Sequence, residues 1–333
     1  MSGYDLTDSE PPLVTALAEA AMDTPNAVAL AWEADGQLGT ITYARLFAET
    51  RQLAGRLLRL ADPGDRIAVW SADGPACTLL GYAAAAAGLV VIPIRTQGRD
   101  DEIAVQLEQA RATLLVCSRL LHGRPALNRA AALTADLRQP CTVIELDTWQ
   151  SLPAGPDDVN DQEAHLPFLV GSGVPEPTLA TANAMSQSAA MSAAATAVAG
   201  LDLRYGDTWC LAFPTRSLSN AAAAALSVLA RRGALAIVAP HDATAVLRLV
   251  ELSAATVLDA TTGMLLEILH HPDRSTYDLS SLRLVVMTDE FPDNDLIAQV
   301  SNGLAVQVGQ LRTPGSAGSR PAAEENRPKS TRS

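Results

Sequence analysis

The sequence predicts an α/β protein with mainly parallel sheets, and two observations lead to that prediction. Short runs of Val, Ile and Leu alternate with longer stretches of helical periodicity, and the connections between them are short. This alternation is typical of parallel sheets covered by helices, because each crossover helix returns the chain to the same edge. With 333 residues and 48% hydrophobic content, the chain is long enough for two lobes.

The first part of the chain supplies a series of strand–helix–strand units. Thr42 is placed to cap a helix in which Leu46, Leu53 and Leu57 form one apolar stripe. The expected helices cover 13–22, the segment after Thr42, 75–87 and 101–110, and the expected strands lie within 27–32, 66–71, 89–94 and 113–118.

A less regular segment, 122–163, follows these units. It contains a predicted strand at 142–146 and then the Pro-, Gly- and Asp-rich run SLPAGPDDVNDQEAH, which we interpret as a connection between lobes. We therefore place a first α/β subdomain at 1–160 and a second at 161–312. Residues 313–333 are rich in Pro, Gly, Ser and charge, which predicts a disordered tail.

The second part of the chain returns to the alternating pattern. It begins with an Ala-rich stretch at 183–199 that is expected to be helical. The further helices are expected at 219–230, 243–252, 264–271 and 293–301, and the strands within 209–213, 234–239, 256–260 and 282–288.

Composition excludes several classes of partner. The net charge of −13 argues against binding to nucleic acid or to an anionic membrane surface. Residues 74–94 carry no charge and are long enough to cross a bilayer, but Gly88 divides them, which favours a buried helix followed by a buried strand. An acidic N-terminus without an apolar signal region and four cysteines without C-x-x-C spacing predict a cytoplasmic protein with reduced, buried thiols.

The order of these segments resembles the AMP-forming adenylating enzymes, a superfamily of acyl-CoA synthetases, acyl-AMP ligases and peptide-synthetase adenylation domains. The resemblance covers residues 12–312 and is carried by TITYARLFAETRQLAGRL, PGDRIAVWSADGPACTLLGYAAAAAGLVVIPI, RYGDTWCLAFP, ELSAATVLDATTGMLLEILHHP and DLSSLRLVVMTDE. It implies the superfamily's N-terminal domain of stacked α/β subdomains. It also implies ATP or AMP as ligand and an acyl substrate, whereas the small C-terminal subdomain is expected to be absent.

The segment FLVGSGVPEPT resembles the family's phosphate-binding loop, and Gly171, Ser172 and Gly173 take the positions expected to contact the nucleotide. Glu176 stands where the family has a lysine, and Pro177 removes one N–H donor. Because Lys329 is the only lysine, no other lysine of the fold can neutralise the phosphates. The segment is therefore interpreted either as a cradle of backbone N–H groups or, preferably, as a stiff turn between strand and helix.

The later motifs depart from the family in the same way. Thr288 and Asp289 replace a Gly-Gly turn, and Gly309 survives from the Y-G-x-T-E motif. Leu311 and Arg312 follow where the family has its phosphate-binding threonine and magnesium-binding glutamate, so a magnesium site is doubtful. The family's aromatic/His motif reads FPTRSLSN, with Arg216 and Ser217 in the two key positions. We assign Thr288, Asp289 and Gly309 as candidate nucleotide contacts, with no catalytic residue and no metal ligand.

Three functional interpretations remain open on the sequence. The favoured one is a shortened homologue with little or no adenylating activity, which binds an acyl group or an acyl-carrier or ligase partner protein. The second is an active carboxylic acid:AMP ligase that a separate C-terminal domain or partner chain completes. The third is a truncated or frameshifted product of a bacterial gene, because a Ser-, Pro- and Arg-rich tail begins at the Y-G-x-T-E position.

Overall fold

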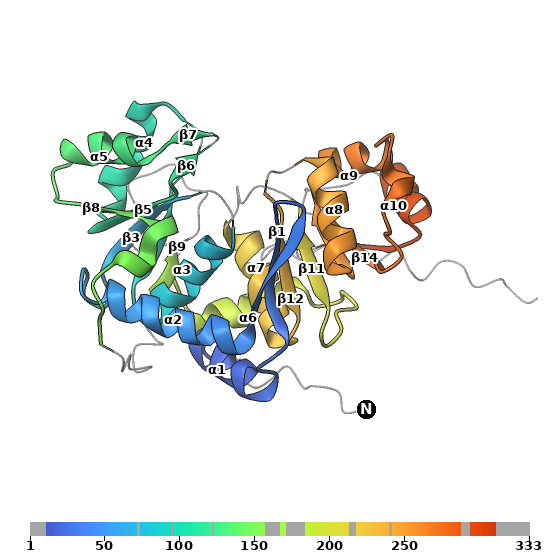
Figure 1. Ribbon diagram of the computed structural model, residues 1–333, viewed down its shortest axis with the longest axis horizontal. Helices are drawn as coiled ribbons and strands as arrows, with labels where there is room; N and C mark the ends of the chain where they lie inside the picture. The colour runs from blue at the N-terminus through green and yellow to red at the C-terminus, as the bar shows by residue number, and fades with distance from the viewer. Residues whose placement is uncertain are drawn as a thin grey trace, which may run out of the picture.

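The computed structural model describes residues 11–71, 74–94, 96, 98–121, 123–156, 167–170, 184–212, 218–239, 242–287 and 294–310. Two large β-sheets lie in separate lobes, and helices pack on both faces of each sheet (Figure 1). The predicted α/β class with mostly parallel sheets is confirmed.

The first lobe is built on a six-stranded sheet. Its strand order is β10-β9-β4-β3-β5-β8, and every neighbouring pair is parallel except β9 with β10. The strands are β3 (Arg66–Trp70), β4 (Val90–Pro93), β5 (Leu114–Cys117), β8 (Thr142–Glu145), β9 (Pro167–Val170) and β10 (Ala184–Ser186).

The second lobe is built on a seven-stranded sheet with the order β15-β14-β13-β11-β12-β1-β2. Only the hairpin of β1 and β2 is antiparallel. The strands are β1 (Val28–Ala34), β2 (Gln37–Thr42), β11 (Thr208–Leu211), β12 (Ala234–Ile237), β13 (Val257–Ala260), β14 (Leu284–Met287) and β15 (Gln307–Gln310).

The helices form three layers around these sheets. The central layer fills the space between the sheets and contributes to the largest apolar core; it contains α1 (Leu13–Asp23), α2 (Tyr43–Leu57), α3 (Pro75–Ala86), α6 (Gln187–Ala197) and α7 (Leu218–Ala230). The outer face of the six-stranded sheet is covered by α4 (Asp100–Ala110) and α5 (Leu127–Ala135). The outer face of the seven-stranded sheet is covered by α8 (Ala243–Ser253), α9 (Thr262–Leu269) and α10 (Asn294–Leu304).

The division between the sheets does not coincide with the predicted subdomain boundary at residue 160. The hairpin β1–β2 precedes that boundary but pairs with β12 in the second sheet, whereas β9 and β10 follow it and belong to the first sheet. The segment 122–163 is also more regular than expected. It contains α5, and β8 is a strand of the first sheet; β6 (Leu120–Leu121) pairs with β7 (Arg124–Pro125) beside it.

The uncharged stretch 74–94 forms the buried helix α3 and the buried strand β4, as predicted. Gly88 follows the helix with a φ of 65°, a left-handed conformation that glycine adopts without strain. In the described parts of the chain, no helix combines the length and the apolar character that a membrane span requires.

Helix α2 carries a close backbone crossing at Gly55. A Cβ built on Gly55 would lie 2.3 Å from the carbonyl oxygen of Pro156, and a Cβ on Gly155 would lie 1.5 Å from the carbonyl oxygen of Gly55. Arg56 lies beside the crossing and donates a hydrogen bond to the Leu152 carbonyl. The chain that follows β8 is thus held directly against α2, and only glycine permits that approach.

Replacing Gly55 by alanine is therefore expected to lower the free energy of unfolding by about 1–3 kcal/mol, because the added methyl group overpacks the crossing. Gly81→Ala in α3 is the matched control, since a Cβ there meets nothing within 4 Å. The control should leave stability unchanged or raise it by up to about 1 kcal/mol. Urea unfolding of both variants measures the difference in the free energy of unfolding. Equal changes in Gly55→Ala and Gly81→Ala would contradict the close backbone contact at Gly55.

Candidate functional site

The carboxyl edge of the seven-stranded sheet is the candidate site. In parallel α/β sheets, ligands bind in the crevice outside the carboxyl ends of the strands. Near this edge one row of residues runs across six strands in register: Trp32, Ile237, Leu211, Asp259, Val286 and Gly309. Ile237 and Leu211 are the last residues of β12 and β11, and Asp259 is the last but one of β13. The row therefore lies immediately beneath the edge.

Asp259 is the only charged residue in this row. Its side chain is fully buried, and neither carboxylate oxygen has a hydrogen-bond partner. It lies on the face of the sheet that packs against the central core, as do Trp209, Leu211 and Val286. Burial raises the pKa of Asp259 well above its ordinary range, and the indole N–H of Trp209 opposes that rise more weakly.

Trp209 is the second polar group without a partner at this position. Its ring is buried, and Nε1 makes no hydrogen bond with acceptable geometry, including to the nearby Asp259. Burial, together with the neighbouring Asp259 carboxylate, raises the pKa of the Cys210 thiol on the opposite face. An acceptor and a donor thus lie close together in an apolar environment, and each lacks a partner.

A second buried carboxylate in the same sheet, Asp207, has the opposite surroundings. It precedes β11 at the amino edge and accepts hydrogen bonds from Thr256 Oγ1 at 2.8 Å and from the Arg204 backbone N–H at 2.6 Å. Arg283 completes the group with an ion pair. Asp207 shows how this fold stabilises a structural carboxylate, and Asp259 has none of these contacts.

Gly309 is the one predicted nucleotide contact that lies among the described residues. It pairs with Val286 at the edge strand β15. A Cβ on Gly309 would lie 2.4 Å from Cδ2 of Leu201, so the space beside its Cα is filled by a side chain. Packing against Leu201 therefore gives a structural reason for glycine at this position, and its contact with a nucleotide stays a prediction.

The other predicted contacts, Gly171, Ser172, Gly173, Thr288 and Asp289, lie outside the described residues. The same holds for the substituted motif positions Glu176, Pro177, Arg216, Ser217, Leu311 and Arg312. Their contacts with a nucleotide stay predictions. The sequence analysis did not single out Asp259, although an acidic residue inside the apolar strand TVLDA is itself an unusual signal.

Metal and thiol chemistry has no evident site in the part of the chain that the structure describes. No group of three or more His, Cys, Asp or Glu side chains is placed there to hold a metal ion. The four cysteines are free thiols; Cys117 and Cys210 are buried, whereas Cys77 and Cys141 are partly exposed. Burial is the main cause that raises the pKa of Cys117 and Cys141 to about 11, so both are protonated at neutral pH.

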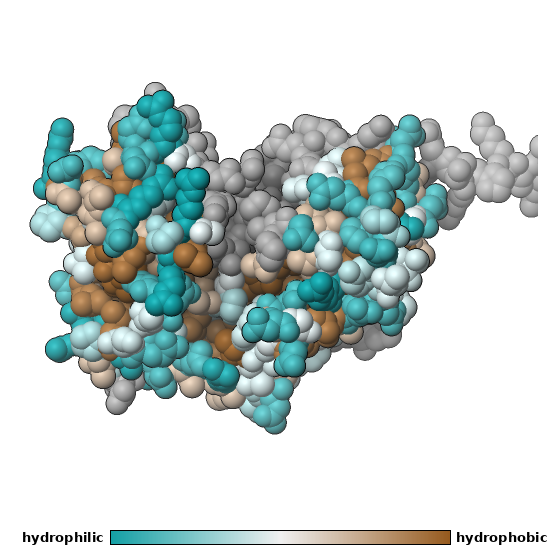
Figure 2. Space-filling view, turned by 45° about the horizontal axis from the view of Figure 1, so that its top comes forward, coloured by the Kyte–Doolittle hydropathy of each residue, from teal (hydrophilic) through white to brown (hydrophobic). Residues whose placement is uncertain are grey.

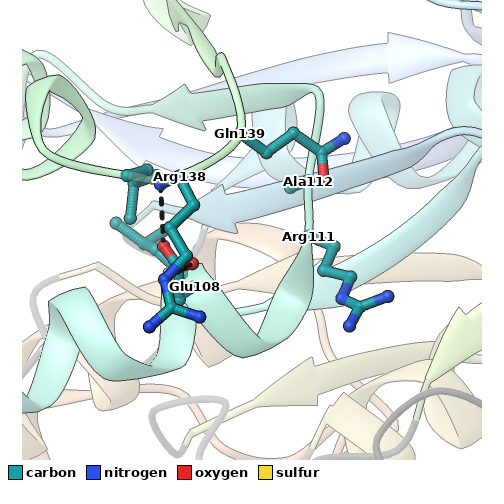
Figure 3. A pocket seen from close by; sticks show the side chains of 7 residues that line it. Glu108, Arg111, Ala112, Arg138 and Gln139 are labelled. Atoms are coloured by element: carbon teal, nitrogen blue, oxygen red, sulfur yellow. Dashed lines mark hydrogen bonds and ion pairs between the residues drawn. The ribbon is translucent and has the colours of Figure 1, made fainter.

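A pocket of about 210 Å³ lies elsewhere, near the amino ends of β5 and β8 (Figure 3). Glu108 accepts a hydrogen bond from the Arg138 backbone N–H at 3.2 Å, and Arg111 points away from this pair. The pocket is at the amino edge of the six-stranded sheet, opposite to the edge at which such sheets bind ligands.

The described part of the outer surface exposes several large apolar side chains. Figure 2 shows mainly hydrophilic side chains over both lobes, with hydrophobic ones in separate areas. The most exposed large apolar side chains, Met22, Val105 and Tyr205, belong to different segments of the chain. Scattered apolar residues of this kind are normal on a protein surface.

Comparison with known proteins identifies the family. The family model described as AMP-binding enzyme matches residues 17–311, and the chain belongs to this family. Feruloyl-CoA synthases from Amycolatopsis and Streptomyces are each 28% identical over 286 residues, which cover 84% of this chain and 55% of theirs. The chain spans about half the length of the curated relatives it matches.

Solved structures support the fold. The N-terminal domain of FACL13 from Mycobacterium tuberculosis matches with a TM-score of 0.75 at 19% identity, over 92% of this chain and 76% of that domain. The N-terminal subdomain of Klebsiella oxytoca NpsA matches with a TM-score of 0.66 at 19% identity, over 90% of this chain and 72% of that one. The predicted similarity to the N-terminal domain of AMP-forming ligases is therefore confirmed.

The raised pKa of Asp259 generates a prediction for the pH dependence of stability. The carboxyl of Asp259 keeps its proton to higher pH in the folded protein than in the unfolded chain. Its favourable contribution to the free energy of unfolding is therefore complete below about pH 4. As pH rises toward the native pKa, the wild type loses about 1.4 kcal/mol per pH unit from this group, and Asp259→Asn does not. Urea unfolding at several pH values should show the variant gaining stability over the wild type as pH rises.

Asp278→Asn is the control for that series. Asp278 is exposed, and hydrogen bonding from Ser280 lowers the pKa of its carboxyl, which is the opposite direction. Its variant should show no gain over the wild type with rising pH. A constant difference between Asp259→Asn and the wild type across the series would contradict a proton held by Asp259.

Proposed function

We propose that this member of the AMP-binding family binds a carboxylic acid ligand but has little or no adenylating activity, so that it acts in a binding or accessory role. The observation that carries the proposal is chemical. The only lysine of the sequence is Lys329, and Glu176 occupies the position of the lysine in the family's phosphate loop. Both features reduce the positive charge available to a triphosphate.

The chemistry of adenylate formation makes this loss decisive. The acid's carboxylate attacks the α-phosphate of ATP, and pyrophosphate leaves with a large negative charge. Enzymes stabilise such charge with fixed cations and oriented hydrogen-bond donors, each of which lowers the activation free energy by several kcal/mol. Leu311 and Arg312, in place of the threonine and the magnesium-binding glutamate, weaken the same stabilisation at a second position.

Family membership makes ATP or AMP the class of nucleotide concerned, and the proposal is that this nucleotide binds weakly. Magnesium binding is proposed to be weak for the same reason, since Arg312 replaces the expected carboxylate. An acyl-carrier or ligase protein is the partner class that suits an accessory role. A cytoplasmic location is proposed on composition alone.

ATP–pyrophosphate exchange tests the proposal. Across a panel of carboxylic acids, the purified protein should show exchange at the level of the protein-free blank. Glu176→Lys should tighten ATP binding by about tenfold or more, because a repulsive charge becomes an attractive one. Glu267→Lys makes the same charge change on the exposed face of α9 and should leave ATP binding unaffected. Rapid exchange by the wild type alone would overturn the proposal.

The second candidate function is an active ligase completed by further polypeptide. This function is favoured by the comparison of lengths, because the match covers only 55% of the feruloyl-CoA synthases. In this case Arg216 or Arg312 replaces the lysine charge. Adding the separately expressed C-terminal part of such a relative should then produce exchange, and Arg216→Ala should abolish it. Exchange that Arg216→Ala leaves unchanged would contradict this role for the arginine.

A further inference from the structure

We infer that the pocket at the end of α4 is a second binding site, which takes a monoanionic carboxylate with a small apolar body, of the size of benzoate. This inference goes beyond the proposed function, because the pocket lies at the amino edge of the six-stranded sheet and not at the carboxyl edge of the seven-stranded one. Its basis is a cavity with an apolar floor and, at its mouth, an arginine that has no partner within the described part of the chain.

Two parts of the chain enclose the pocket. One is the last turn of α4 with Arg111 and Ala112 after it, and the other is the segment 137–139 between α5 and β8. Leu107 and Ala112 are buried, and Leu137 packs against the same core, so the floor of the pocket is apolar. A dry cavity of about 150 Å³ holds benzene. The volume of about 210 Å³ therefore accommodates a ring of that size together with a carboxylate.

Arg111 has a backbone conformation that an arginine does not favour. It is the C-cap of α4 with a φ of 49°, in the left-handed region where glycine is the usual residue. It is exposed at the mouth of the pocket and makes no hydrogen bond or ion pair with any residue that the structure describes. Neither the backbone conformation nor a polar contact of the described chain thus accounts for an arginine at this position.

A second arginine with the same backbone conformation shows what such a residue does when its partner is present. Arg232 has a φ of 53°, and its guanidinium Nη2 lies 3.0 Å from Asp23 Oδ2 and 3.5 Å from Glu19 Oε2. These two carboxylates fix the side chain of Arg232, which is only 13% exposed. Arg111 has no such carboxylate partner in the described chain, and a ligand carboxylate can supply one through two parallel hydrogen bonds.

The charges and positions of the other residues around the pocket agree with a monoanion. Glu108 accepts a hydrogen bond from the backbone N–H of Arg138, and its Oε1 lies 3.6 Å from Nε of the same arginine, so these two charges offset each other. Arg111 then provides the one uncompensated charge among the described residues that line the pocket. In the view of Figure 3, Arg111 and the amide of Gln139 lie on the side away from that pair, with Ala112 between them. The amide N–H can donate a further hydrogen bond to the ligand carboxylate.

Calorimetric titration of the full chain with benzoate tests this assignment, and no adenylation is required. Benzoate should bind about tenfold or more tighter than benzyl alcohol, which lacks the charge that Arg111 pairs with. It should bind tighter than acetate by a similar factor, because acetate has no ring to cover the apolar floor. Inorganic phosphate is the third comparison and should bind no tighter than acetate, since it also lacks an apolar body.

Arg111→Gly should weaken benzoate binding by about tenfold or more, because the charged hydrogen bonds are lost. The same variant should leave the midpoint of thermal unfolding unchanged or raise it by up to about 4 °C, since glycine adopts the left-handed conformation without strain. Arg111→Gln removes the charge but keeps a long side chain, and it should weaken binding to a similar extent. Arg231→Gln is the control for the loss of a positive charge: Arg231 is exposed, precedes β12 of the other sheet, and should not affect binding.

The outcomes separate this inference from the proposed function. Absence of a saturable benzoate-binding step that both Arg111 variants weaken would overturn the inference, and so would a preference for phosphate over benzoate. A lower unfolding midpoint in Arg111→Gly would overturn it as well, because the arginine would then serve the fold. A further binding step that neither variant changes belongs to the acid site of the proposed function, and rapid ATP–pyrophosphate exchange would overturn that proposal alone.

Discussion

A single buried glutamine connects the elements on which the two-lobed structure depends. Gln187 begins α6, accepts a hydrogen bond from the backbone N–H of Val14 at 3.1 Å and donates one to the carbonyl of Ala85 at 3.0 Å. It therefore satisfies one free N–H at the start of α1, whose N-cap Pro12 makes no side-chain hydrogen bond, and contacts the end of α3. Three helices of the central layer meet at this side chain.

The position of Gln187 along the chain explains why this junction matters for both sheets. It follows β10 of the six-stranded sheet, and α6 packs against α7, which leads into β12 of the seven-stranded sheet. The helices at the junction are rich in alanine, and Ala83, Ala84 and Ala194 are nearly or fully buried. Small side chains allow the helix backbones to approach closely, so the central layer is thin enough to contact both sheets. The high alanine content of the sequence thus has a structural role in this layer.

Local patterns in the sequence were sufficient to predict most helices and strands. They were not sufficient to predict how these elements assemble. The strands β3, β4, β5, β11, β12, β13 and β14 all lie where short apolar runs predicted them. The pairing of β1 with β12 joins residues about 200 positions apart, and no local signal encodes such a contact. The edge strand β15 was missed because Gln307 and Gly309 interrupt the apolar pattern, and α5 was missed because few of its residues are buried.

Prediction of the candidate site from the sequence was limited as well. Family resemblance directed attention to glycines, yet Gly309 is explained by packing against Leu201. Asp259 has no family motif to mark it, and only burial together with missing partners distinguishes it from Asp207. The sequence places Asp259 inside an apolar strand and Asp207 just before one, but the contacts of Asp207 with Thr256 and Arg283 come from distant segments and cannot be read from it.

The chain has the fold of the AMP-binding family, and our proposal is that it lacks the charges that adenylate formation requires. Calorimetric titration of the folded protein with Mg-ATP and then with a non-hydrolysable acyl-adenylate mimic tests this description most directly. The account predicts binding of Mg-ATP that is too weak to saturate and saturable binding of the acyl-adenylate mimic. Tight, saturable binding of Mg-ATP would contradict it, because a site without the lysine and magnesium-binding carboxylate would then still hold a triphosphate.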